Sequence, residues 1–97
     1  MTMSACDNWL EKQLILINSR GLHARASAKF VKMAESFSAE ITVEKDHVCV
    51  CGTSIMGLML LAAACGDGIM LRARGGDAAA ALAALEALVA DRFHEAD

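Results

Sequence analysis

The sequence predicts an α+β domain in which one mostly antiparallel sheet is covered on one face by helices. Two-residue and helical periodicities follow one another in the order β-α-β-β-α-β-α, without an internal repeat or a linker. The chain has 97 residues, of which 56% are hydrophobic and none is proline, and this is typical of one compact domain. A domain of this size has little room for a deep pocket, so we expect its function to lie on the surface.

The first two predicted elements are a strand over residues 13–17 and a helix that begins at Ala24. The run "QLILI" is short and apolar, and "NSRG" closes it, as expected for a buried strand that ends in a turn. After this turn the apolar spacing becomes three and four residues, which predicts one buried helical face. The residues on that face are Ala26, Phe30, Val31, Ala34 and Phe37.

The remaining predicted elements are a hairpin of two strands, a short helix, a last strand and a long helix. "AEITVEK" and "DHVCVCG" both alternate, and we expect their turn at Lys45-Asp46, although this pair lacks the glycine that hairpin turns favour. Ser54 is a favoured N-cap and predicts a short helix that ends near Gly66. "IMLRAR" is predicted as the last strand, and Asp77 as the cap of the alanine-leucine helix "AAAALAALEALVADRF".

Composition excludes several classes of function. A net charge of −3 and a pI of about 5.5 argue against a general nucleic-acid binder. The N-terminus "MTMSACDNWLEKQ" lacks the pattern of a secretory signal, and the longest apolar run, "SIMGLMLLAAAC", is too short to cross a bilayer. We therefore expect a cytoplasmic protein that does not insert directly into a membrane. Its cysteines are predicted to be reduced thiols: Cys6, Cys49, Cys51 and Cys65.

His23 is the main candidate for chemistry, because it directly precedes the first predicted helix. The unpaired N–H groups of a first helical turn favour anions such as phosphate, and they favour a neutral, nucleophilic imidazole. Arg25 can pair with phosphate oxygens through its fork of donors. No acidic residue is close to His23 in sequence, which suits a phosphoryl acceptor because a carboxylate would repel the group. The alternative is a histidine that only begins a helix and packs in a loop.

Two stretches resemble the HPr family of histidine-containing phosphocarrier proteins of the bacterial phosphotransferase system. "GLHARASAKFVKMAESFSAEITV" is similar to the segment around the family's Gly-Leu-His-Ala-Arg-Pro motif, and "TSIMGLMLLAAACGDGI" to its Ser-Ile-Met-Gly signature. The resemblance spans about residues 13–93, which leaves residues 1–12 as an N-terminal extension and 94–97 as a tail. It implies an open-faced sandwich, a four-stranded antiparallel sheet covered on one face by three helices.

The resemblance also implies roles for particular residues. His23 would accept a phosphoryl group from phosphorylated enzyme I and pass it to an EIIA-type protein, and Arg25 would contact the group. The protein would then be a carrier and a cosubstrate, not an enzyme, with no cofactor or metal and no nucleic-acid partner, and we expect a monomer. Ser54 corresponds to the serine that an HPr kinase/phosphorylase modifies in some branches of the family.

A partner-docking surface is implied beside this site. Ile55, Met56 and Met59 match the family's apolar docking patch, and methionine suits surfaces that meet several partners. Lys29 and Lys32 follow Arg25 at helical spacing and form a basic stripe able to steer an acidic partner. The alternatives are that the apolar residues belong to the core and that the cations form an ordinary solvated face.

Two positions depart from the family pattern. Ala26 stands where the family has proline, and since alanine keeps the helix and adds an N–H, we expect altered rigidity without loss of chemistry. Thr53 stands where many relatives have lysine before the serine, which weakens the case for modification of Ser54.

Two other functions stay open. His47, Cys49 and Cys51 alternate along one predicted strand, where they would share a sheet face able to meet zinc or copper, although a fourth ligand is not evident. Alternatively, the domain regulates partners through its phosphorylation state without any transport. The sequence does not separate the sugar branch from the nitrogen-related branch of the system.

Overall fold

The computed structural model describes residues 9–95, and its elements follow the predicted order with one short addition at the end. They are β1 (Leu10–Ile15), α1 (Ala24–Glu35), β2 (Glu40–Lys45), β3 (Val48–Cys51), α2 (Ile55–Leu60), β4 (Gly68–Arg74), α3 (Ala78–Ala90) and the single 3-10 turn η2 (Arg92–His94). Cys6 and most of the predicted N-terminal extension lie outside the described residues.

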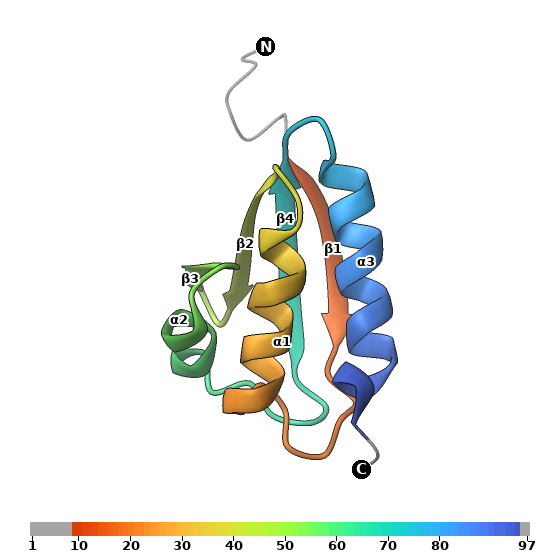
Figure 1. Cartoon of the computed structure of the whole chain (residues 1–97). Coiled ribbons are helices and arrows are strands. Elements are labelled where there is room, and N and C mark those ends of the chain that lie inside the picture. The colour runs from red at the N-terminus through yellow and green to blue at the C-terminus, as the bar shows by residue number, and fades with distance from the viewer. Residues whose placement is uncertain (1–8, 96–97) are drawn as a thin grey trace.

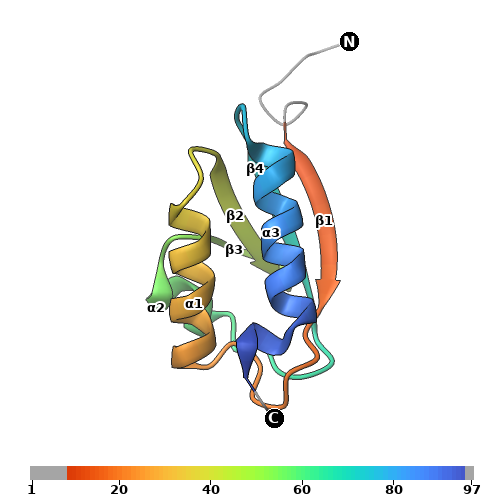
Figure 2. The same ribbon diagram turned by 45° about the vertical axis from the view of Figure 1, so that its right-hand side comes forward.

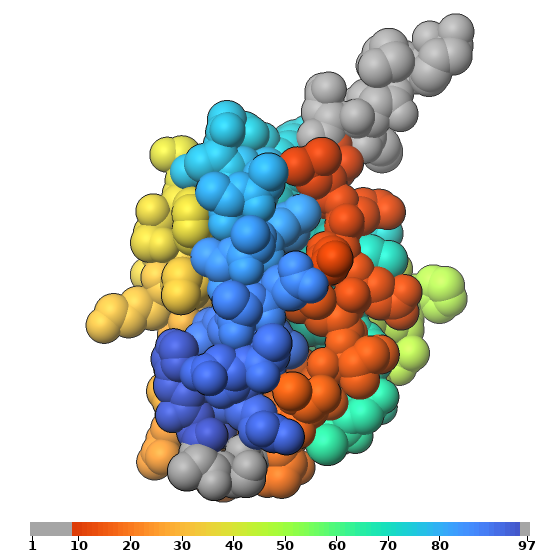
Figure 3. All heavy atoms as spheres, turned by 90° about the vertical axis from the view of Figure 1, so that its right-hand side faces the viewer, coloured from red at the N-terminus to blue at the C-terminus, as the bar shows by residue number. Residues whose placement is uncertain are grey.

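The strands form one antiparallel sheet in the order β1-β4-β2-β3. α1 and α3 lie side by side over one face of this sheet, and α2 lies beside β3 (Figure 1, Figure 2). The space-filling view in Figure 3 shows α3 running the length of the molecule between α1 and β1. The predicted open-faced sandwich is confirmed.

The core lies between the sheet and the two long helices. Along β4, Ile69, Leu71 and Ala73 are buried while the residues between them are partly exposed, so a single face of the strand packs against the helices. On α1, Phe30 is fully buried, as the apolar spacing predicts. Within residues 9–95, no helix combines the length and hydrophobicity that crossing a membrane requires.

Two predicted element boundaries are wrong. β1 occupies Leu10–Ile15 and not residues 13–17, because its pairing with β4 begins at Leu10. α2 ends at Leu60 and not near Gly66, because Ala62 has a left-handed φ of 52° that a right-handed helix cannot contain.

Two predicted turn details are also wrong. The hairpin turn has Asp46 and His47 at its centre, both with positive φ, and not Lys45-Asp46, since Lys45 pairs with Val48. Asp77 makes no side-chain cap to α3. Its Oδ2 instead accepts a hydrogen bond of 2.8 Å from the Ser38 N–H, which connects the start of α3 to the loop after α1.

Candidate functional site

His23 occupies the N-cap position of α1, with extended backbone angles of φ −75° and ψ 178°. Its side chain makes no capping hydrogen bond to the helix. The ring instead points to the C-terminal segment, where Nε2 lies 3.2 Å from Glu95 Oε1, and only 16% of the side chain is exposed. His23 therefore does not act as an ordinary helix cap, and its ring takes part in a tertiary contact.

Gly21 shapes the loop that carries His23. Its φ is +63°, and a Cβ at this position would lie 2.3 Å from the Ala63 carbonyl oxygen, so only glycine fits. The next residue, Leu22, donates its N–H to the same carbonyl at 2.9 Å. The β1–α1 loop is thus in direct backbone contact with the loop that follows α2.

Two buried polar side chains hold this loop from inside. The Asn18 amide nitrogen donates to the Gly21 carbonyl at 2.8 Å, and the Ser27 hydroxyl donates to the Leu22 carbonyl at 3.2 Å. Both side chains are fully buried. Because buried hydrogen bonds are costly to break, they restrict the backbone immediately before His23.

The prediction that no carboxylate lies beside His23 is wrong. Glu95 is remote in sequence, but it follows η2, and its side chain contacts the His23 ring at the start of α1. In Figure 2 the segment after α3 lies near the beginning of α1. The Glu95 carboxylate is also 3.9 Å from the Lys29 ammonium, which offsets part of its negative charge. The spacing of neighbouring residues in the sequence cannot predict this contact, because the two residues are 72 positions apart.

The three predicted cations of α1 have different surroundings. Arg25 and Lys32 are exposed, and neither has an ion-pair partner among residues 9–95. Lys29 is partly buried and donates a hydrogen bond of 2.7 Å to the Phe93 carbonyl. Arg25 is therefore available to an anion beside His23, whereas Lys29 already holds the C-terminal segment in place.

α2 presents an apolar surface next to α1 (Figure 1). Ile55, Met56 and Met59 are exposed, and Leu58 alone points into the core. Leu60 is 76% exposed, as much as Met56, and belongs to the same surface, although the sequence patterns did not single it out. A helix this short buries only one side, which leaves the other apolar residues in solvent.

Ser54 caps α2 as predicted. Its hydroxyl oxygen accepts a hydrogen bond of 3.0 Å from the Gly57 N–H, which satisfies one of the free donors of the first turn. Ser54 thus lies directly beside the exposed Ile55 and Met56.

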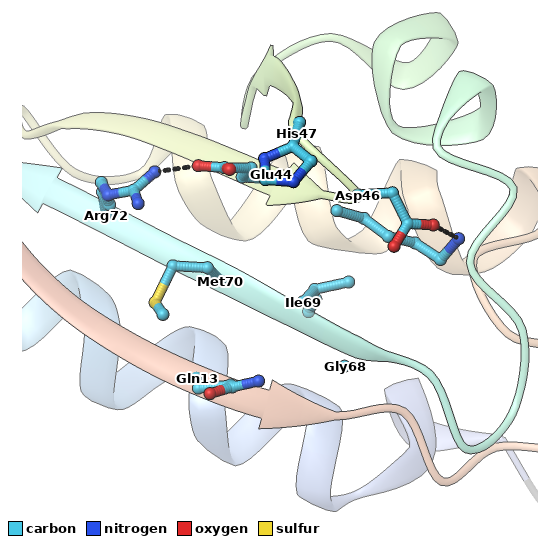
Figure 4. Close-up of a pocket in the computed structure, with 9 residues that line it drawn as sticks. Gln13, Glu44, Asp46, His47, Gly68, Ile69, Met70 and Arg72 are labelled. Carbon is cyan, nitrogen blue, oxygen red and sulfur yellow. Dashed lines mark hydrogen bonds and ion pairs between the residues drawn. The ribbon is translucent and has the colours of Figure 1, made fainter.

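The open face of the sheet carries a separate hollow of about 350 Å³, which contains no residue of the His23 site (Figure 4). Its charged side chains neutralise one another. Hydrogen bonds to Glu11 and Glu44 raise the pKa of the Arg72 guanidinium, and the hydrogen bond from Lys45 lowers the pKa of the Asp46 carboxyl. This hollow therefore offers no free cation for a phosphate.

The structure does not support the alternative metal site at His47, Cys49 and Cys51. His47 lies in the hairpin turn, and β3 begins only at Val48, so the three residues do not alternate along one strand. In the described part of the chain no three metal-ligating side chains come together. Cys49, Cys51 and Cys65 are exposed free thiols.

Comparison with known proteins gives one consistent family. A family model described as "PTS HPr component phosphorylation site" matches residues 10–91. A phosphocarrier protein HPr of Neisseria meningitidis is 47% identical over 88 residues, which cover 91% of this chain and 99% of that protein. A phosphocarrier protein NPr of Shewanella violacea is 42% identical over 87 residues, with 90% and 96% covered.

Solved structures agree with the sequence comparisons. The crystal structure of an HPr from Thermoanaerobacter tengcongensis matches with a TM-score of 0.87 and 41% identity, over 91% of this chain and 99% of that one. An HPr from Bacillus anthracis matches with a TM-score of 0.81 and 42% identity, over 84% and 96%. By sequence and by fold, over nearly all of its length, the chain therefore belongs to the HPr family of phosphocarrier proteins of the phosphotransferase system.

Proposed function

We propose that this protein carries a phosphoryl group on His23, which it accepts from phosphorylated enzyme I and donates to an EIIA-type protein. It acts as a cosubstrate of both partners and not as an enzyme, in sugar uptake or in nitrogen-related regulation. One observation carries the assignment to His23: Nε2 of the ring is engaged by Glu95, while Nδ1 has no hydrogen-bond partner among residues 9–95. Nδ1 is therefore the nitrogen available to accept the group.

In the transfer, the Nδ1 lone pair attacks phosphorus in line with the leaving nitrogen of the donor phosphohistidine. One N–P bond forms as the other breaks, and the electron pair of the broken bond returns to the donor imidazole. No co-reactant is consumed. In the onward step a nucleophile of the EIIA-type protein attacks the same phosphorus, the Nδ1–P bond breaks, and its electron pair returns to the His23 ring. The domain contributes positioning and electrostatic stabilisation.

Arg25 supplies charge to this step. Its guanidinium is exposed and has no ion-pair partner in the described part of the chain, so it can form bidentate hydrogen bonds with the oxygens of the transferring group. The first-turn N–H groups of α1 add partial positive charge at the same end of the helix. Ala26 contributes one of these N–H groups, which the proline of other family members lacks.

Partners would dock on α2 and on the adjoining end of α1. The exposed side chains of Ile55, Met56, Met59 and Leu60 supply the apolar contact. Lys32 and Lys29 lie beside Leu88 and His94, on the side of α1 that faces α3, and from there they would steer an acidic partner by longer-range attraction. Since the partners are enzymes of the phosphotransferase system, we infer a cytoplasmic, monomeric carrier. Docking of this kind is transient and needs a small apolar centre with a polar rim.

Ser54 is proposed as a site of regulatory phosphorylation. A phosphoserine would add about −1.5 to −2 charges beside Ile55 and Met56. That charge would weaken docking of an acidic partner surface without a large change in fold. An aspartate at position 54 mimics part of this charge, so we expect Ser54→Asp to slow transfer from enzyme I.

The central test is phosphorylation by phosphoenolpyruvate and a cognate enzyme I, followed by intact-mass measurement before and after mild acid. We expect one acid-labile phosphoryl group on the wild type and none on His23→Ala, whose fold is checked by circular dichroism. Uptake by the His23→Ala variant would contradict the assignment. No uptake by the wild type, with an active enzyme I control, would favour a regulatory module that acts by binding alone.

A further inference from the structure

We propose that Glu95 is a positioning residue for phosphoryl transfer, which holds His23 in the tautomer that leaves the Nδ1 lone pair free. This inference rests on the proposed function of His23. The carboxylate accepts the Nε2–H of the ring at 3.2 Å, and a carboxylate has no proton to donate in return. The other neutral tautomer would place the Nε2 lone pair against a carboxylate oxygen, which is a repulsive arrangement.

The surroundings of Glu95 make this preference strong. Only 13% of its side chain is exposed, and Oε2 is buried without a hydrogen-bond partner among the described residues. Within the described part of the chain, Oε2 pairs with the Lys29 ammonium at 3.9 Å, which is beyond hydrogen-bond distance. The hydrogen bond from His23 is therefore the main compensation for burial of this carboxylate, and its loss would be costly.

The backbone is specifically arranged to deliver Glu95 to this place. Arg92, Phe93 and His94 all have left-handed φ angles between 53° and 61°, a conformation that costs roughly 1–2 kcal/mol for each non-glycine residue. Burial of Phe93 and the 2.7 Å hydrogen bond from Lys29 to the Phe93 carbonyl hold this turn. Without the turn, the chain would continue beyond α3 and Glu95 would not reach the ring.

The contact also suits the charge that develops during transfer. When Nδ1 forms its bond to phosphorus and Nε2 keeps its proton, the ring gains positive charge, which the carboxylate stabilises. The phosphoryl group binds to Nδ1, the ring nitrogen that Glu95 does not contact. Lys29 offsets part of the carboxylate charge, which reduces the repulsion between the two anionic groups. A carboxylate that orients an imidazole without accepting its proton has the same role in serine-protease triads.

The test begins with the full-length chain labelled with ¹⁵N in its histidine rings. At neutral pH, long-range ¹H–¹⁵N spectra report the tautomer of His23, and the exposed His47 serves as an internal reference. We expect the Nε2–H form to dominate in the wild type. Glu95→Gln retains an acceptor oxygen and should preserve this form, whereas Glu95→Ala should shift His23 towards the mixture seen for His47.

Transfer kinetics give the second readout. We expect Glu95→Ala to lower kcat for acceptance from phosphorylated enzyme I roughly ten-fold or more, with KM unchanged, and Glu95→Gln to restore part of the rate. Glu86→Ala is the matched control, because it removes another C-terminal-half carboxylate that forms an exposed pair with Lys12. Backbone spectra of all variants verify the fold.

The outcomes separate this inference from the proposed function. If the wild type takes up no phosphoryl group, the proposed function fails and this inference fails with it. If the wild type is phosphorylated but the His23 tautomer or kcat does not respond to Glu95→Ala, this inference alone is overturned. If Glu95→Ala lowers kcat only as much as Glu86→Ala does, this inference is also overturned.

Discussion

His23 Nε2 lies 3.2 Å from Glu95 Oε1, although the two residues are 72 positions apart in the chain. The contact joins the start of α1 to the segment after α3, and Figure 1 shows both at the same end of the molecule. The site is therefore built from two segments that are far apart in the sequence and meet at one end of the fold.

Replacing Arg25 should slow phosphoryl transfer without affecting stability. Arg25→Ala removes a charge-assisted hydrogen-bond donor worth about 1.5–3 kcal/mol, so we expect roughly a 10- to 100-fold lower rate of acceptance from enzyme I. Rapid-quench kinetics would measure this rate. Lys32→Ala is the control, because Lys32 is another cation of α1, lies two turns further along the helix and has no ion-pair partner among residues 9–95. Equal effects of the two changes would indicate general steering and not contact with the phosphoryl group.

A charge in the centre of the α2 surface should weaken docking. Met56 is 76% exposed, so Met56→Glu should leave the fold intact, and we expect KM for phosphorylated enzyme I to rise about ten-fold, as for loss of a well-packed contact. Leu60→Glu should act in the same direction. Ile15→Glu is the control, because Ile15 is an exposed apolar residue of β1 that does not belong to α2. An increase in KM for all three variants would contradict a specific docking role for α2.

Gly21 should tolerate no side chain. Gly21→Ala combines a left-handed φ with a contact of 2.3 Å to a backbone oxygen, so we expect a loss of at least about 2 kcal/mol in the free energy of unfolding. Variants at two other glycines distinguish the effect of the left-handed φ from that of the close contact. Gly66→Ala has a positive φ but open space and should lose about 1 kcal/mol, while Gly76→Ala has neither problem and should change stability by less than about 0.5 kcal/mol.

Urea unfolding of the three glycine variants, monitored by circular dichroism, would test this order. A Gly21→Ala variant as stable as Gly76→Ala would show that the β1–α1 loop can move away from Ala63. In that case, the position of His23 would be less restricted than its backbone contacts indicate.

His47→Gly should stabilise the hairpin. His47 is exposed, and its φ of 69° carries a left-handed cost of about 1–2 kcal/mol that glycine avoids. Glycine loses more backbone entropy on folding than histidine does, which costs about 0.5–1 kcal/mol. We therefore expect the free energy of unfolding to rise by about 0.5–1 kcal/mol. Urea unfolding would measure it. A loss of stability would mean that the His47 side chain contributes a contact beyond its backbone conformation.

Much of the fold could be predicted from local patterns. The apolar spacing of α1 gave its start at Ala24, and the alternation of β2 gave its buried Ile41 and Val43. Local patterns do not predict element boundaries as well, because pairing with β4 and not the intrinsic preference of the residues decides where β1 begins. Asp77 shows the same effect, since its side chain accepts a hydrogen bond from Ser38 and does not cap its own helix.

Motifs and periods of only a few residues are enough to predict the family, the order of the elements and the positions of His23, Arg25 and Ser54. The contacts that these side chains make depend on tertiary packing. Glu95 reaches His23 through a left-handed turn after α3. Lys29, which the sequence predicts to be a free surface cation, donates a hydrogen bond to the backbone of that turn. Such contacts depend on the packing of α1 against the end of the chain, and the spacing of residues within one element carries no information about that packing.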